Sequence, residues 1–263
     1  MSYIDLRGHQ VWSVVHENNG EPVLLMHGGL SSTEDWDFTV LPAVASDHHV
    51  YSYDRSAHGR TKIRDGYFHF DFQTDEAIAY IEDVIKEPTH LIGWSDGGII
   101  SLLIALKRPD LVKSIIAIGT NYNHDSGLSF NLSTVQVPEE DKALFVERSG
   151  QDPELLVEIV TKAFQVWATE PNMTLEQLSK IEVPVLILAG DDEPFGSAHT
   201  FEMYEAFPNG RLAVLPGASH YVVKEQAKLM QSVIRDFYIK PEFPITKYAN
   251  RRKARQREIL GNS

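Results

Sequence analysis

The chain has 263 residues, 43% of them hydrophobic, with a formal net charge of −13 at pH 7. This length suits one domain, or one domain with an insertion, and allows a substantial core. The negative charge argues against nucleic acid as the main partner. The chain has no cysteine, which excludes disulfides, thiolate metal sites and a cysteine nucleophile.

The N-terminal residues 1–7 contain no apolar segment of the kind found in signal peptides. No apolar run in the sequence is long enough to span a bilayer. We therefore predict a cytoplasmic protein without a membrane span.

Apolar runs of strand length alternate with amphipathic helical patterns. The predicted strands are Val11–His16, Pro22–Met26, Val50–Tyr53, His90–Gly93, Ser114–Ile118, Pro184–Ala189 and Arg211–Leu215. The predicted helices are Phe72–Lys86, Gly98–Lys107, Ser197–Phe207 and Val222–Tyr238. Continuous Val/Ile/Leu runs such as residues 185–188 indicate strands buried on both faces. We therefore predict an α/β fold with a mostly parallel sheet covered by helices on both sides.

The segment Gly93-Trp94-Ser95-Asp96-Gly97-Gly98 connects a predicted strand to a predicted helix. Strand, G-x-S-x-G and helix in succession are typical of a nucleophile elbow, which exposes its serine on a tight turn. Such a turn strains the backbone at the serine and leaves no room for Cβ atoms beside it, hence glycine at 93 and 97. An ordinary glycine-rich turn is the alternative, and the flanking elements favour the elbow.

Residues 121–175 interrupt the alternation with several short helical patterns and no convincing strand. A structureless loop of this length is uncommon in a compact domain. We predict a helical cap inserted between two strands and lying over the active site, with residues 1–120 and 176–239 forming the core. The aromatic residues of the cap either form its own core or face the site; they are Phe130, Phe145, Phe164 and Trp167.

Residues 240–263 carry seven basic and two acidic side chains, so this tail has a charge of +5 and the remaining body −18. We predict a solvated segment that lies on the acidic body or on a neighbouring subunit of a homo-oligomer. Contact with nucleic acid or an anionic membrane is the alternative. It is disfavoured because the tail lacks interleaved aromatic residues and a strong apolar stripe.

A serine hydroxyl needs a base within hydrogen-bond reach to act as a nucleophile. His220 follows the last predicted strand and leaves the same carboxyl edge of the sheet as Ser95, so we predict it to be the base. The base in turn needs a carboxylate to orient it. Asp191, Asp192 and Glu193 follow the preceding strand and satisfy the chain order Ser, Asp/Glu, His.

With these residues, the chain resembles the α/β-hydrolase superfamily over about residues 3–239. His27-Gly28-Gly29-Leu30 resembles the oxyanion loop of that family. Residues 54–61 resemble its D-R-x-G-H-G-x-S segment, with Ala57 in place of the usual glycine. The elbow G-W-S-D-G-G is similar to that of valacyclovirase-like hydrolases, which cleave α-amino acid esters. The resemblance implies the α/β-hydrolase fold with an inserted cap.

The resemblance leaves two positions for the triad acid. Counting forward from Gly190 gives Glu193, and counting back from His220 gives Asp192. Because members of the family use aspartate far more often than glutamate, we predict Asp192, with Glu193 as the alternative and Asp191 third.

Two N–H donors must stabilise the oxyanion of an acyl transfer reaction. We predict the amide of Asp96, at a helix N-terminus, and by resemblance that of Gly29. The Asp96 carboxylate either favours substrates with a nearby ammonium group, such as amino acid esters, or merely complements the helix dipole. Trp36 and Trp94 either line the substrate pocket or belong to the core.

These residues predict a serine hydrolase that cleaves a small carboxylic ester through an acyl-enzyme, with no cofactor or metal. The same triad also serves lactones, amides, thioesters and C–C bonds. An epoxide hydrolase or haloalkane dehalogenase is disfavoured, because by resemblance these need aspartate at the nucleophile position. A metallohydrolase is disfavoured by the lack of H-E-x-x-H. A non-catalytic binding protein that retains the pocket is the alternative from another class.

Overall fold

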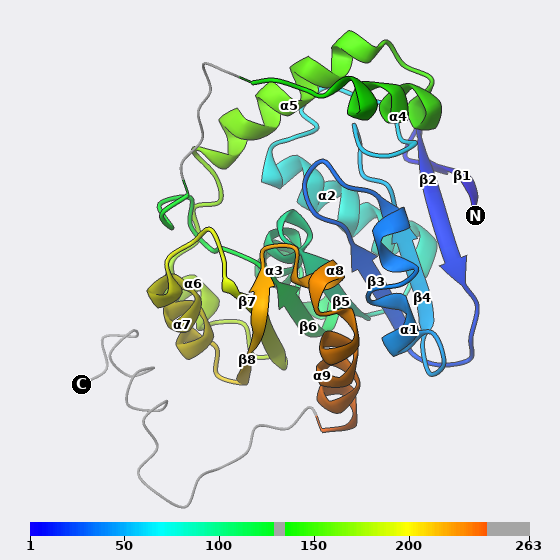
Figure 1. Ribbon diagram of the computed structural model, residues 1–263. Coiled ribbons are helices and arrows are strands. Elements are labelled where there is room, and N and C mark those ends of the chain that lie inside the picture. The colour runs from blue at the N-terminus through cyan, green and yellow to red at the C-terminus, as the bar shows by residue number, and fades with distance from the viewer. Residues whose placement is uncertain (129–134, 241–263) are drawn as a thin grey trace, which may run out of the picture.

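The computed structural model describes residues 1–128 and 135–240 (Figure 1). Eight strands form one sheet in the order β1-β2-β4-β3-β5-β6-β7-β8. β2 runs antiparallel to β1 and β4, and every other neighbouring pair is parallel, which confirms the mostly parallel sheet. The strands are β1 (Ser2–Leu6), β2 (His9–His16), β3 (Pro22–Met26), β4 (His49–Tyr53), β5 (Thr89–Trp94), β6 (Val112–Ile118), β7 (Val185–Asp192) and β8 (Gly210–Ser219).

Helices cover both faces of this sheet, as the buried strands predict. The described helices and helical turns are η1 (Thr33–Trp36), α1 (Leu41–Val44), α2 (Phe70–Tyr80), η2 (Ile81–Ile85), α3 (Asp96–Lys107), η3 (Pro109–Leu111), α4 (Glu139–Ser149), α5 (Pro153–Trp167), α6 (Leu175–Leu178), α7 (Ser197–Ala206), α8 (Val222–Glu225) and α9 (Ala227–Ile239). One core cluster joins α2, α3 and α7 to one face of the sheet, and the other joins α1 and α9 to the opposite face. In β7, residues 185 and 187 belong to the first cluster and residues 186 and 188 to the second.

Two strands extend further than their apolar runs predict. β7 continues to Asp192 and β8 to Ser219, and these two residues pair with each other. A register shift lies between Gly190 and Asp192. This irregular end of the sheet positions the acidic residues of the candidate site.

β1 is a strand that the sequence patterns do not predict. It lies at the edge of the sheet beside β2, and only Leu6 among its residues is buried.

The single helix predicted over residues 222–238 is divided in the structure, because the chain leaves helical geometry at Gln226 (φ −123°) between α8 and α9.

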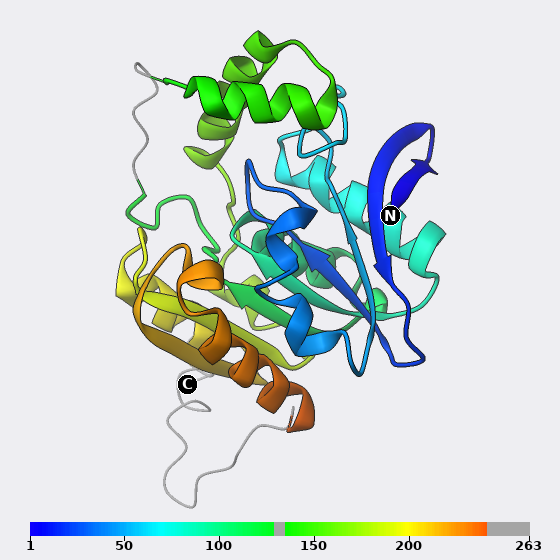
Figure 2. The ribbon, with the colours of Figure 1, turned by 45° about the vertical axis from the view of Figure 1, so that its right-hand side comes forward.

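The segment between β6 and β7 carries α4, α5 and α6. Figures 1 and 2 show α4 and α5, in green, packed side by side above one end of the sheet. Asp152 caps the N-terminus of α5 by accepting a hydrogen bond from the Glu154 amide. Phe130 of the predicted cap and the basic tail beyond residue 240 lie outside the described residues.

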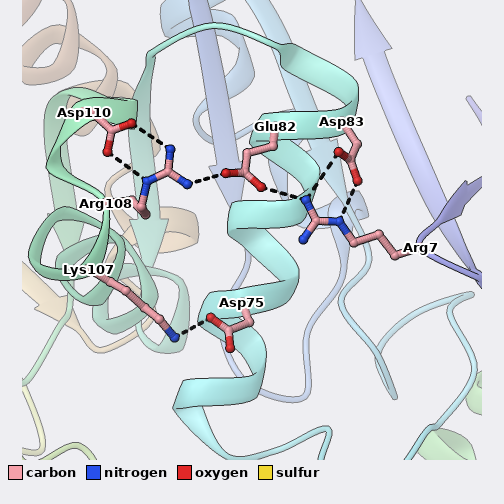
Figure 3. A network of polar contacts seen from close by, with 7 residues as sticks. All are labelled: Arg7, Asp75, Glu82, Asp83, Lys107, Arg108 and Asp110. Atoms are coloured by element: carbon pink, nitrogen blue, oxygen red, sulfur yellow. Dashed lines mark hydrogen bonds and ion pairs between the residues drawn. The ribbon is translucent and has the colours of Figure 1, made fainter.

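A network of ion pairs joins the N-terminal hairpin to the helix layer (Figure 3). Arg7, directly after β1, pairs with Glu82 at 2.7 Å and with Asp83 at 2.8 Å in η2. Glu82 also pairs with Arg108, which follows α3 and pairs with Asp110 at 2.7 Å. Because these side chains are partly or fully exposed to solvent, each pair contributes little to stability. Among the described residues, no helix has the length and apolar character that crossing a membrane requires.

Candidate active site

Ser95 occupies a strained turn between β5 and α3, with φ 54° and ψ −118°. A Cβ atom on Gly93 would lie 2.1 Å from the Gly97 carbonyl carbon, and one on Gly97 would lie 1.9 Å from the Met26 carbonyl oxygen. Neither position therefore accepts a side chain. The backbone has the tight geometry that the G-x-S-x-G pattern predicts, with the serine at its apex.

His220 connects Ser95 to a carboxylate. Its Nε2 lies 3.0 Å from Ser95 Oγ, and its Nδ1 lies 2.7 Å from Glu193 Oε2. A carboxylate accepts hydrogen bonds, so the Nδ1 proton donates to Glu193 and leaves Nε2 free to accept the hydroxyl proton of Ser95. The indole of Trp94 also donates to the His220 carbonyl oxygen at 3.0 Å. This order of donors and acceptors is that of a serine–histidine–carboxylate triad.

The prediction that Asp192 contacts His220 is wrong, because Glu193 takes that place. Asp192 is still part of β7, where it pairs with Ser219 and is exposed. The chain turns after it, and the Glu193 side chain is only 5% exposed. Glu193 Oε1 also accepts the Gly190 amide at 3.0 Å, which fixes the carboxylate under the imidazole.

Asp191 has a third, separate position. Its two carboxylate oxygens accept the amides of Gly217 and Ala218, at 3.0 Å and 3.1 Å, in the segment that leads to His220. These hydrogen bonds lower the pKa of the Asp191 carboxyl. Asp191 and Glu193 thus bind different groups, and the Asp192 side chain is exposed.

Gly29 lies close to Asp96, the residue that follows the nucleophile. Asp96 is the first residue of α3, where an amide has no acceptor within the helix. A Cβ atom on Gly29 would lie 2.5 Å from Asp96 Oδ2 and 2.2 Å from Trp167 Cζ2. Glycine is thus required where the Gly28–Gly29 loop, the elbow and the end of α5 converge.

Asp96 is only 2% exposed, and its Oδ2 accepts a hydrogen bond from Trp167 Nε1 at 3.1 Å. Burial raises the pKa of this carboxyl, whereas the charge of Arg55, the Trp167 hydrogen bond and His220 oppose the increase. The helix N-terminus also favours the charged form, but the net direction is a raised pKa.

Arg55 supports the loop before Gly29, a role that the sequence patterns do not reveal. Its fully buried guanidinium donates to the carbonyl oxygens of His27 at 2.5 Å and Gly28 at 3.1 Å. Its Nε donates to Gln73 Oε1 of α2 at 2.8 Å. Arg55 matches the arginine of the D-R-x-G-H-G-x-S segment, but the match does not reveal its role, which is evident from its burial and contacts behind the loop.

A cavity of about 650 Å³ opens above Ser95. The core contributes Gly29, Trp94, Ser95, Asp96 and His220, and the segment of α4 and α5 contributes residues that include Leu144, Arg148, Phe164 and Trp167. Of the two places predicted for Trp36, the pocket and the core, the structure shows the core. Its side chain is 2% exposed and packs in the core cluster of α1 and α9. Trp94 belongs to that core as well and also reaches the cavity.

Both basic side chains in the described cavity wall are ion-paired with acidic ones. Lys224 pairs with Asp35 at 2.7 Å, and Arg148 pairs with Glu34, which also pairs with Arg60 at 2.7 Å. The Asp96 carboxylate, directly after the nucleophile, has a hydrogen bond from Trp167 and no ion pair among the described residues.

The chain is similar to several known proteins along most of its length. It is 24% identical over 243 residues to the (E)-2-((N-methylformamido)methylene)succinate hydrolase of Acinetobacter baylyi, which covers 83% of this chain and 90% of that protein. It is 22% identical over 237 residues to the serine hydrolase BPHL of Mus musculus, which covers 83% of this chain and 79% of that protein.

The fold is also similar to those of solved structures. The enol-lactonase of Burkholderia xenovorans matches with a TM-score of 0.70 at 16% identity, over 90% of this chain and 100% of that one. The sequence model of the alpha/beta hydrolase family matches residues 23–230, which include the elbow, the acidic segment and His220. The chain is therefore an enzyme of the alpha/beta hydrolase family.

Proposed function

We propose that this hydrolase cleaves small carboxylic esters through a covalent acyl-enzyme on Ser95. One observation carries the proposal: the chain of two hydrogen bonds from Ser95 through His220 to Glu193, at the bottom of a cavity of small-molecule size. Each group has the partner that its role in acyl transfer requires.

In the first step, Ser95 Oγ attacks the ester carbonyl carbon while His220 Nε2 takes the hydroxyl proton. Glu193 holds the imidazole in the required tautomer and stabilises the imidazolium that forms. The tetrahedral intermediate collapses, the C–O bond to the alcohol breaks, and His220 returns its proton to the departing alcohol. In the second step, a water molecule deprotonated by His220 attacks the acyl-enzyme, and the released Ser95 regains the proton.

The amides of Gly29 and Asp96 serve as donors to the oxyanion in both tetrahedral intermediates. A preorganised pair of donors of this kind is usually the largest single contribution to catalysis. Two observations support the assignment: the place of Asp96 at the start of α3, and the close approach of Gly29 to the Asp96 side chain. The Arg55 hydrogen bonds to the preceding carbonyl groups keep the loop in this position.

We further propose that the Asp96 carboxylate recognises an ammonium group near the scissile carbonyl, as in amino acid esters. The carboxylate lines the cavity next to Ser95, and one of its oxygens is already held by Trp167. The cations of the cavity wall are occupied by Asp35 and Glu34, so the cavity offers an anion and no free cation among the described residues. A lactone is the alternative substrate, because the enol-lactonase that shares this fold is named for one.

A fluorophosphonate probe tests the mechanism. We expect one covalent adduct by intact mass in the wild type and none in Ser95→Ala. Turnover of 4-nitrophenyl esters should follow the same dependence on Ser95. A folded wild-type protein that takes up no probe and hydrolyses no ester would contradict the proposal and favour a non-catalytic binding protein.

A further inference from the structure

The segment that precedes His220 is held by a carboxylate of the neighbouring strand. The amides of Gly217 and Ala218 donate to Asp191 Oδ2 and Oδ1, at 3.0 Å and 3.1 Å. The two donors lie three and two residues before His220. One side chain thus binds two consecutive amides in the chain that carries the base.

The backbone at this point needs such support because regular strand pairing is interrupted. The register shifts between Gly190 and Asp192, and Gly217 has a φ of 66°. A Cβ atom on Gly190 would lie 2.2 Å from the Ala218 carbonyl oxygen, so the two strands approach closely beside the irregularity. Asp191 replaces ladder hydrogen bonds with side-chain ones at the position where β8 leaves its regular register.

Further contacts fix the residues on the other side of the same segment. Glu225 accepts the Ser219 amide at 2.7 Å and the Ser219 hydroxyl at 3.0 Å. Trp94 Nε1 donates to the carbonyl oxygen of His220. The segment is thus anchored at residues 217–218, 219 and 220, and Asp191 provides the first of these anchors.

We propose that Asp191 is a positioning residue, which keeps the His220 imidazole aligned between Ser95 and Glu193 by holding the amides of residues 217 and 218. This inference rests on the proposed function, since it concerns the base of the same reaction. Asp191 is exposed and contacts neither Ser95 nor His220, so its loss acts on the geometry of the base and leaves the core packing unchanged. Misplacing a catalytic group by about 1 Å lowers the rate on the order of 100-fold.

The test compares Asp191→Asn with Asp192→Asn, two isosteric changes at adjacent exposed residues. Asparagine at 191 retains one acceptor oxygen and places an NH2 group, which cannot accept, against the second amide. We expect Asp191→Asn to lower kcat on 4-nitrophenyl acetate by about 10- to 100-fold per probe-labelled serine, with KM and the thermal midpoint nearly unchanged. Asp192→Asn should retain wild-type kcat. Asp191→Glu, which retains both acceptors, should recover part of the loss.

Counting turnover per labelled serine separates positioning from folding, because a merely structural loss reduces the number of active molecules and not the rate of each. Wild-type kcat per labelled serine in Asp191→Asn would overturn the inference, as would an equal loss in Asp192→Asn. A wild-type protein without Ser95-dependent turnover would overturn the proposed function itself. If the wild type shows turnover and Asp191→Asn is unaffected, only the positioning role of Asp191 is ruled out.

Discussion

Trp167, at the end of α5, donates a hydrogen bond from its indole Nε1 to Asp96 Oδ2 at 3.1 Å. Asp96 is the residue that follows the nucleophile. The contact links the segment above the cavity to the elbow. It also gives a buried carboxylate a donor without giving it a positive charge.

Asp96→Asn should lower kcat/KM for an amino acid 4-nitrophenyl ester by about 10- to 100-fold more than for its desamino analogue. The reason is that a hydrogen bond to a charged group contributes roughly 1.5–3 kcal/mol. Trp167→Phe, which keeps an aromatic ring and removes the donor, is the control for a general disturbance of the cavity and should affect both esters similarly. Equal losses on the two esters in Asp96→Asn would dismiss ammonium recognition.

Glu193→Gln should lower kcat by about 1,000- to 10,000-fold, because the amide cannot hold the imidazole in its working tautomer. Asp192→Asn, one residue away, should stay near the wild-type value, since its side chain is exposed at the end of β7. Steady-state kinetics on a neutral 4-nitrophenyl ester measures both. A large loss in Asp192→Asn together with an active Glu193→Gln would mean that Asp192 is the triad acid.

The sequence predicts the parts of this molecule that depend on local patterns. Buried runs such as residues 185–188 identify the central strands, because both of their faces are covered and every residue must be apolar. β1 escapes prediction for the opposite reason: it is an edge strand with one buried residue, and its pairing with β2 is what makes it a strand.

The candidate site likewise has parts that local sequence patterns predict and parts that they do not. The strand and helix around Ser95 and the loop of His220 are visible in the sequence, so their meeting could be predicted. The choice between Asp192 and Glu193 could not, because it depends on where β7 ends and on a register shift set by β8. Arg55 was missed as well, because its role comes from burial behind a loop 27 residues away.

Gly29→Ala should lower kcat by about 100- to 1,000-fold, comparable to the loss of one oxyanion donor. The added methyl group would lie 2.2 Å from Trp167 Cζ2 and 2.5 Å from Asp96 Oδ2, so the loop and its amide must move. Trp167→Ala removes one of these clashes, so Gly29→Ala should lower kcat less in the Trp167→Ala background than in the wild type. No loss in the single variant would mean that the Gly29 amide is not an oxyanion donor.

The free energy of unfolding should fall as the pH decreases from 7 to 5, and His58 should account for part of the loss. This histidine is buried, and burial together with the charge of Arg55 lowers its pKa to about 3. The unfolded chain has the ordinary histidine pKa of about 6.5, so below that pH the unfolded state binds a proton that the native state does not.

The loss for His58 begins near pH 6.5, continues until the native ring protonates near pH 3, and amounts to about 2 kcal/mol between pH 7 and pH 5. Urea unfolding of the wild type and of His58→Asn at the two pH values measures it. Asparagine retains a donor for the Ser56 carbonyl oxygen, which His58 Nδ1 contacts at 2.9 Å, but cannot titrate. The variant should therefore lose about 2 kcal/mol less than the wild type over this range. An identical pH dependence in the two proteins would show that His58 is protonated equally in the native and unfolded states, in conflict with its burial beside Arg55.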